Sequence, residues 1–267
     1  MKKLTVGKVV FPLYTFLALA FLLAPIVYTF VFSFNQARRR NTVWNDFTFD
    51  NWLNVCSRQD LCDAVGASLL VSLVSTILAT ILGTAIAIGL VRYRFKARSA
   101  VSLSLFLPMA TPEIVMASSL ASLFFNVGLE RGYLTLILAH TMFCLSFVVV
   151  TVKARVQMLD PAIEEAGADL YANPRQVFWK ITFPLLLPGI MAAALLSFAL
   201  SFDDFIITYF NAGNVTTFPL FIYIAAKGGL PPTANVIACT VFFLAIFIVI
   251  ATQIYGNVKR KRLALAK

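Results

Sequence analysis

The sequence predicts an all-α protein that crosses a membrane several times. Of its 267 residues, 60% are hydrophobic and only 13% are charged, and the mean hydropathy is +0.85. An ordinary soluble domain carries about 45–50% apolar and about 25% charged residues, so this composition excludes a soluble enzyme. Disorder is excluded as well, because a chain so rich in Phe, Leu, Ile and Val would collapse or insert into a membrane.

Six apolar stretches are each long enough to cross a hydrocarbon core, which takes about 20 residues. They are predicted to be helices, because lipid offers backbone groups no partner and the alternating segments of a transmembrane barrel are absent. The first stretch is about twice as long as the core of a signal peptide and lacks a small-residue cleavage site after it, so it is interpreted as a helix. In a single domain over residues 1–267, we expect spans over about 9–35, 66–91, 100–125, 133–152, 183–210 and 234–257.

The distribution of basic residues predicts how the chain is oriented across the membrane. The net charge is +10. With a cytoplasmic N-terminus, 16 of the 22 basic residues lie inside: Lys2, Lys3, Lys8, Arg92, Arg94, Lys96, Arg98, Lys153, Arg155, Arg175, Lys180, Lys259, Arg260, Lys261, Arg262 and Lys267. The positive-inside rule therefore favours cytoplasmic termini, although the run 38–40 works against it locally. Because the basic residues are scattered over four juxtamembrane segments, a nucleic-acid surface is disfavoured.

The loops differ in length and chemistry. On the outside, residues 36–63 form a loop with two aromatic clusters, and residues 211–233 form a second segment rich in Gly and Pro. Cys56 and Cys62 both lie in the first loop, where the compartment is oxidising, so the sequence leaves open a disulfide or two free thiols. Cys144 and Cys239 are expected to be buried thiols within spans.

The inside segment 153–182 changes from continuously apolar to amphipathic. Asp160-Pro161 is a helix-start signal, because the carboxylate can cap and Pro is tolerated at the first helical position. Asn173-Pro174 ends the pattern. We therefore predict a short surface helix over about 161–173. Helical spacing gives it an apolar face and an acidic face: Ile163, Ala166 and Leu170 on the first, Glu165 and Asp169 on the second.

The spacing within this segment resembles a family signature. The chain reads Glu165-Ala166-Gly167, three residues, Tyr171, nine residues, then Ile181-x-Phe183-Pro184. This closely resembles Glu-Ala-Ala, three residues, Gly, nine residues, Ile-x-Leu-Pro, the signature of permease subunits of ATP-binding-cassette importers. Three positions depart from the signature, and the bulky Tyr171 at the usual Gly is expected to alter how the loop leaves the helix or fits its partner.

The resemblance implies a MetI-like permease fold of a type I importer, whose short helix docks on a separate ATPase subunit. It also implies the residues that take part in this coupling, which are Glu164, Glu165, Ala166, Gly167, Asp169, Leu170, Tyr171 and Arg175. The chain contains no Gly-x-x-x-x-Gly-Lys-Ser/Thr loop, so it is not expected to be an enzyme, and ATP and Mg²⁺ would be bound by partner ATPase subunits. A second permease subunit, two ATPase subunits and an extracytoplasmic substrate-binding protein are the implied assembly.

Three carboxylates lie within predicted spans: Glu113, Asp203 and Asp204. A carboxylate inside a bilayer is costly, so it normally faces a cavity or a partner and marks a transport path. Asp204 continues a polar stripe of the fifth span, whose other members at helical spacing are Ser197, Ser201 and Thr208. Asp203 lies about 100° round the helix from it. The alternatives are that the two aspartates lie among headgroups at the helix end, and that Glu113 is paired in a structural role.

Several segments narrow the resemblance to the spermidine/putrescine-type permeases, the second of the two permease subunits. These segments are Ser201–Phe205, Pro219-Leu220 and Pro232–Asn235, together with the arrangement of the spans. Carboxylates interleaved with aromatic rings fit a chain of ammonium groups and methylenes by ion pairing and cation–π contact. The expected substrate path comprises Glu113, Ser201, Asp203, Asp204, Phe205, Thr208 and Tyr209.

Two other functions stay open at this point. The chain could be a permease for another small solute of the same family, or an ion-coupled secondary carrier or channel with the same carboxylates as its relay. His140 is the only histidine, so a histidine-based metal cluster is excluded, and we interpret it as a packed imidazole.

Overall fold

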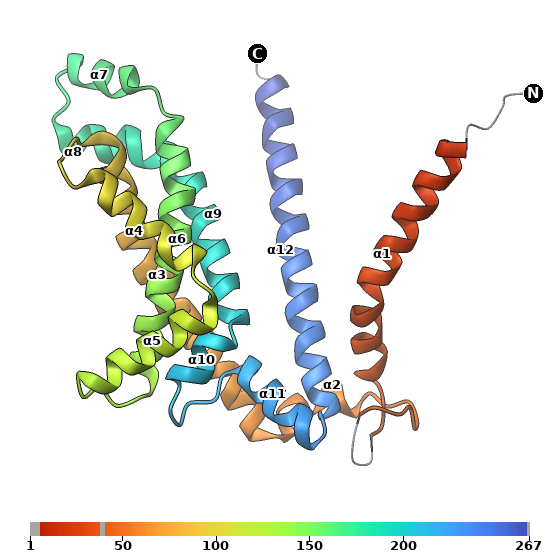
Figure 1. Ribbon diagram of the computed structural model, residues 1–267. Helices are drawn as coiled ribbons and strands as arrows, with labels where there is room; N and C mark the ends of the chain where they lie inside the picture. Colours follow the sequence, from red (N-terminus) through yellow and green to blue (C-terminus); the bar gives the residue numbers. More distant parts are fainter. Residues whose placement is uncertain (1–5, 38–40, 266–267) are drawn as a thin grey trace, which may run out of the picture. The chain divides into compact units, whose positions relative to one another are not determined.

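The computed structural model describes residues 6–37 and 41–265; Lys2, Lys3, the run Arg38–Arg40 and Lys267 lie outside the described residues. Within these ranges the regular elements are helices (Figure 1), and the strand pairing is limited to an isolated bridge between Asn35 and Phe47. The contacts divide the chain into two compact units, and the single domain over residues 1–267 stays a prediction. The first comprises Met1–Cys62 and Ile222–Lys267, and the second Asp63–Phe221.

In the first unit, helices α1 (Val6–Phe32) and α12 (Pro232–Leu265) pack against one another. Phe30 of α1 meets Phe243 of α12 edge to face, with ring centroids 5.6 Å apart. Many large apolar residues of α1 are otherwise exposed, and the most exposed are Phe11 at 74% and Phe21 at 80%. A helix that is apolar all round and exposed in its own chain is suited to contact with lipid or another membrane subunit.

Asparagine side chains order the loop that follows α1. The Asn35 amide is buried and donates to Asn41 Oδ1 at 2.7 Å and to the Val43 carbonyl at 2.8 Å. Asn51, on α2 (Asp50–Leu53), donates back to the Ser33 carbonyl at 2.9 Å. Because a loop has no regular ladder, these side chains provide the partners that its backbone would otherwise lack.

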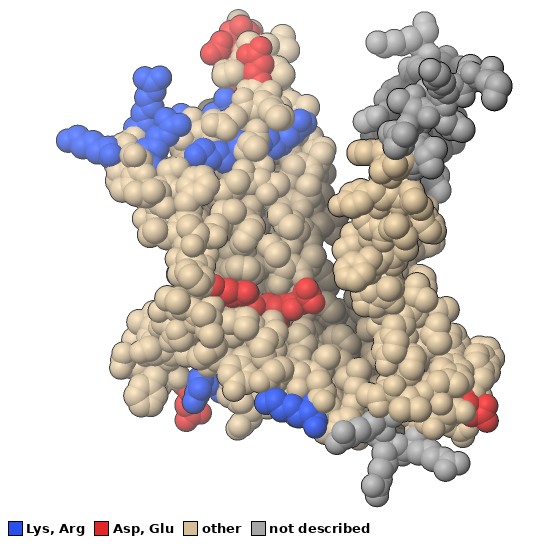
Figure 2. All heavy atoms as spheres, turned by 45° about the vertical axis from the view of Figure 1, so that its right-hand side comes forward, with Lys and Arg blue, Asp and Glu red and all other residues tan. Residues whose placement is uncertain are grey.

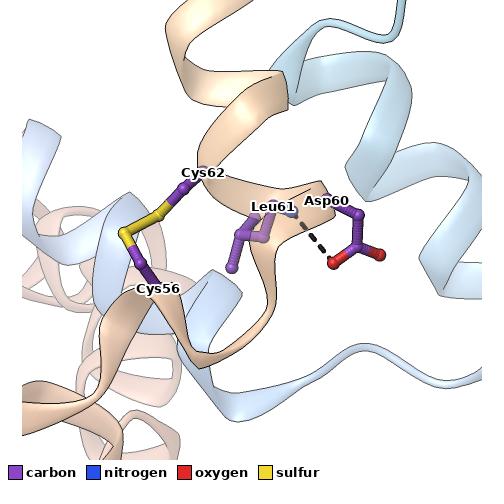
Figure 3. Close-up of a disulfide and its surroundings, with 4 residues drawn as sticks. All are labelled: Cys56, Asp60, Leu61 and Cys62. Carbon is purple, nitrogen blue, oxygen red and sulfur yellow. Dashed lines mark hydrogen bonds between the residues drawn. A yellow bond between two sulfur atoms is a disulfide. The ribbon is translucent and has the colours of Figure 1, made fainter.

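A disulfide closes the turn that leads out of this loop. Cys56 lies in the short 3₁₀ helix η1 (Val55–Ser57), and Cys62 lies in the first turn of α3 (Gln59–Arg92). Their sulfur atoms are bonded (Figure 3), and their Cα atoms are 5.6 Å apart. The crosslink therefore fixes the entry to α3.

In the second unit, α6 (Tyr133–Gln157) and α9 (Phe183–Asp203) form the most extensive helix pair, joined by most of α3. Backbones approach closely where side chains are small: a Cβ added to Gly83 would lie 2.6 Å from a methyl carbon of Val148. Such small residues are how membrane helices gain packing contacts when lipid is as apolar as their side chains.

The membrane helices of this unit are broken at two places. Helix α4 (Arg98–Ala110) meets α5 (Glu113–Asn126) at a bend of 109°, where Thr111 is extended because it precedes Pro112. Helix α9 ends at Asp203, and the chain resumes as α10 (Ile206–Asn211). The helices thus break within the predicted spans 100–125 and 183–210.

The second halves of the two broken helices, α5 and α10, pack against each other, and α10 also packs against α6. Asn211 of α10 donates to the Ala117 carbonyl of α5 at 3.2 Å, and Thr135 of α6 donates to the Asn211 carbonyl at 2.9 Å. Helix α11 (Phe218–Gly228) follows, and Ser68 Oγ of α3 accepts the Phe218 N–H at 2.8 Å.

Four helices are long and apolar enough to cross a membrane, or up to five if the bent pair is one span, among the residues described. The four are Val10–Phe32, Gln59–Arg92, Tyr133–Gln157 and Pro174–Asp203. The described apolar part of α12, Pro232–Ile248, is shorter. The chain is thus a multi-pass helical membrane protein, and the count of six stays a prediction.

Three short helical segments connect α6 to α9. They are α7 (Pro161–Asp169), α8 (Pro174–Val177) and a π-helix, η2 (Phe178–Thr182), which runs directly into α9. Figure 1 shows α7 lying crosswise beyond the end of α6.

The disulfide predicts how many cysteine thiols can be labelled before and after reduction. In unreduced protein unfolded in detergent, we expect a maleimide to label two thiols, those of Cys144 and Cys239, and four after reduction. Intact-mass spectrometry reads the count directly. Four labelled thiols without reductant would contradict the crosslink.

Candidate functional site

Helix α7 begins and ends with well-formed caps. The Asp160 carboxylate accepts the Ala162 N–H at 2.9 Å and Pro161 occupies the first position, which confirms the predicted start signal. At the other end, the N–H of Tyr171 donates to the Ala168 carbonyl, and that of Ala172 to the Gly167 carbonyl. These two bonds define a Schellman motif, in which the residue after the cap adopts a left-handed conformation.

Tyr171 occupies that left-handed position, with φ of +59°. A bulky residue at positive φ is a genuine outlier, and glycine reaches the same conformation without steric cost. The ring is 98% exposed. In this chain, Tyr171 thus adopts the conformation that glycine favours and directs its ring into solvent.

Glu164 anchors α7 to the rest of the unit. Its Oε1 accepts from Arg92 Nη2 at the end of α3 and from Thr182 Oγ1 in η2, both at 2.9 Å. Gly167 is buried, and a Cβ added there would lie 2.7 Å from Cδ1 of Ile181. The small residue at this signature position lets α7 pack closely on η2.

The remaining candidate residues of the segment are exposed: Glu165, Ala166, Asp169, Leu170, Tyr171 and Arg175. Leu170 is 82% exposed, and Ile163 on the same apolar face is 44% exposed. The predicted apolar face is therefore not covered by the rest of the second unit, and carboxylates border it. Such a surface is suited to a protein partner.

A second candidate site lies at the break between α9 and α10. Asp204 ends α9 in an extended conformation, with ψ of 128°, and its side chain is 1% exposed. One carboxyl oxygen accepts the Ile207 N–H at 3.2 Å, and the other accepts the Thr208 N–H at 2.9 Å. The carboxylate thus satisfies backbone donors that the break leaves without helical partners.

The predicted polar stripe turns inward toward α6. Its members are all buried: Ser197, Ser201, Asp204 and Thr208. His140 of α6 bridges two of them, with Nδ1 2.8 Å from Ser201 Oγ and Nε2 3.1 Å from Thr208 Oγ1. From the sequence alone, His140 is interpreted as a packed imidazole and not as part of a site. A buried polar stripe on one span needs a polar partner on another span. The stripe was therefore the sequence signal that could have identified His140.

Other predicted path residues surround this break. Glu113 begins α5, is exposed, and its carboxyl group is a neighbour of the Asp204 carboxyl group. Asp203 is exposed and Phe205 is half-buried. The ring of Tyr209, 53% exposed, lies 5.6 Å from that of Phe205 between centroids. The two helix breaks therefore bring both carboxylates and aromatic rings together.

Most basic residues of the second unit lie at one end of it. Eight of its nine basic residues belong to the segments beside α7, and Arg131 is the exception. Figure 2 shows these basic side chains (blue) at the α7 end, where acidic side chains (red) lie too, and further acidic side chains in a band midway along the surface. Glu113 and Asp203 are exposed carboxylates of this unit at the two helix breaks. An acidic band of this kind attracts cations and repels anions.

Comparisons with known proteins give a consistent result. A model of the family described as binding-protein-dependent transport system inner membrane component matches residues 64–263. The chain is 38% identical over 244 residues to the spermidine/putrescine transport system permease protein PotC of Escherichia coli K12, covering 91% of this chain and 92% of the relative. It is 34% identical over 258 residues to the putrescine transport system permease protein PotI of the same organism, covering 92% and 91%.

A solved structure supports the fold. A chain of a bacterial ABC transporter involved in the import of the acidic polysaccharide alginate aligns with a TM-score of 0.67 and 14% sequence identity. The alignment covers 94% of this chain and 99% of that chain. This likeness concerns the fold alone.

Because the backbone of Tyr171 is left-handed, we predict that Tyr171→Gly stabilises the isolated chain. Removing Cβ from a left-handed residue relieves about 1 kcal/mol of strain, so the thermal unfolding midpoint in detergent should rise. Tyr171→Ala removes the ring but keeps Cβ, and it should give no such rise. A lower midpoint for Tyr171→Gly than for Tyr171→Ala would contradict the strain.

Proposed function

The chain belongs to the family of binding-protein-dependent transport system inner membrane components, and we propose that it forms half of the path of an ATP-driven polyamine importer. In this assembly it pairs with a second permease subunit, two ATPase subunits and an extracytoplasmic substrate-binding protein. Relatives named for spermidine and putrescine transport, 38% and 34% identical over most of both chains, support the cargo.

The observation that carries this proposal is the group of carboxylates at the meeting of two broken helices. In membrane transporters, discontinuous helices commonly form the substrate site, where backbone and side chains are free to take part in binding. Here the second halves of both helices begin beside a carboxyl group, Glu113 for α5 and Asp204 for α10. Ammonium groups of a polyamine would pair with such groups, and its methylenes would pass the rings of Phe205 and Tyr209.

The fold by itself does not select the charge of the cargo. The structurally similar alginate transporter handles an acidic polysaccharide. An anionic solute would be repelled by the exposed Glu113 and Asp203, whereas a polycation would be attracted. The side chains at the breaks are therefore the basis for assigning a cationic substrate.

The exposed face of α7 supports coupling to an ATPase subunit. Glu165 and Asp169 are free to pair with basic groups of a partner, while Leu170 and Tyr171 offer apolar surface. The basic segments beside α7 support a cytoplasmic position for this end of the unit by the positive-inside rule. On the same rule, we propose that both termini are cytoplasmic.

The two neighbouring glutamates of α7 give a matched test of coupling. Glu165→Ala removes an exposed charge and should weaken co-purification of the ATPase subunit while leaving the chain's thermal stability unchanged. Glu164→Ala breaks the bonds to Arg92 and Thr182, so it should lower the stability of the chain itself. Wild-type ATPase recovery and ATP-driven uptake in the Glu165→Ala complex would contradict the coupling assignment.

The two neighbouring aspartates give a matched test of the path. Asp204→Asn deletes a buried charge beside Glu113, and we expect uptake of labelled spermidine to fall at least tenfold, as loss of one charged hydrogen bond allows. Asp203→Asn should have the smaller effect, because Asp203 lies outside the polar stripe. Immunoblots of membranes control for the amount of each variant. A reversed ranking, or equal uptake by wild type and Asp204→Asn, would contradict the role of Asp204.

A further inference from the structure

His140 is the polar side chain of α6 at the break between α9 and α10, and the proposed path does not include it. The residue is 1% exposed. Both ring nitrogens are used, because Nδ1 meets Ser201 in the last turn of α9 and Nε2 meets Thr208 in α10. One imidazole therefore spans the interruption and joins both halves of the broken helix to α6.

The partners fix where the hydrogens lie. An ionised Asp204 carboxylate can only accept hydrogen bonds, so the Thr208 hydroxyl, 3.2 Å from Oδ2, is the donor in that contact. The Thr208 oxygen is then left to accept, and His140 Nε2–H donates to it. The Ser201 hydroxyl in turn donates to His140 Nδ1, which a neutral imidazole leaves as an acceptor.

This assignment makes a chain of hydrogen bonds that all run toward one carboxyl group: Ser201 to His140, His140 to Thr208, and Thr208 to Asp204. Direct contact between His140 Nε2 and Asp204 Oδ2 is 3.5 Å, too long for a good hydrogen bond. His140 therefore acts on Asp204 through Thr208. A neutral ring also avoids burying a second charge within the unit.

We infer that His140 is a positioning residue, whose neutral imidazole fixes the Asp204 carboxyl group through Thr208 and holds the α9–α10 break against α6. The inference rests on the proposed function, because it assigns His140 a role in cargo binding by Asp204. Through this chain of contacts, the sole histidine helps to determine how the path binds an ammonium group.

Two substitutions separate positioning from space-filling. The amide of Gln extends to the place of Nε2 and can still donate to Thr208, whereas the shorter Asn reaches only the place of Nδ1 and Ser201. In the complete transporter, we expect His140→Asn to raise KM for labelled spermidine about tenfold, with Vmax per complex little changed. His140→Gln should stay within about threefold of wild type. Equal KM values for the two variants, or a loss confined to Vmax or protein amount, would overturn the inference.

A double-mutant cycle tests whether His140 acts through Asp204. In an Asp204→Asn background, His140→Asn should change KM by less than about twofold, because the group that it positions is already altered. A second tenfold rise would overturn the inference. Thr208→Val, which removes the hydroxyl between them, should reproduce the rise in KM seen for His140→Asn. A wild-type KM in Thr208→Val would equally overturn it.

A readout without cargo separates this inference from the proposed function. In thermal unfolding of the purified complex, the losses caused by His140→Asn and Asp204→Asn should be less than additive if the two groups share one network. Additive losses would overturn the inference. If the wild-type complex takes up no polyamine, the proposed function fails, and the thermal cycle still decides whether His140 positions Asp204.

Discussion

A helix that is interrupted inside a membrane must find partners for the backbone groups that the interruption releases, because lipid offers none. In this chain, the Asp204 carboxyl group provides partners for the N–H groups of Ile207 and Thr208. The second unit depends on this interaction, since it lets α9 stop and α10 restart against α5 and α6. The carboxyl group that the backbone needs also lies near Glu113, whose own side chain is exposed.

Helix α9 connects this site to α7, the helix that we propose contacts an ATPase subunit. Its 21 residues span about 30 Å. One end carries Asp204, and the other continues from η2, where Thr182 is bonded to Glu164 of α7. A displacement of α7 by a bound ATPase subunit would thus pass along one helix, packed against α6, to the carboxylate. π-Helical segments such as η2 often mark functional positions, and here Pro184 removes an N–H that a regular helix would use.

Residue patterns predicted much of this architecture, and the failures have physical causes. Apolar runs located the helices, and Asp160-Pro161 located the start of α7, because these signals are local. The same periodicity carried the fifth span through residue 210, since nothing local shows that a carboxylate inside a polar stripe will cap a new helix. His140 was placed in the packing because its partners lie 61 and 68 residues away in the sequence. Tyr171 shows a third limit: spacing identified a signature glycine position, but the left-handed backbone that explains it appears only in three dimensions.

The most direct test of the account uses the complete complex in proteoliposomes, with ATP inside and the loaded binding protein outside. Initial uptake of labelled spermidine is measured against that of a labelled dicarboxylate of similar length, with and without ATP. The account predicts uptake of the polyamine alone, and only with ATP, because the carboxylates at the two helix breaks select cations and the chain obtains its energy from a partner. Uptake of the dicarboxylate at a comparable rate, or of spermidine through the chain without ATP, would contradict it.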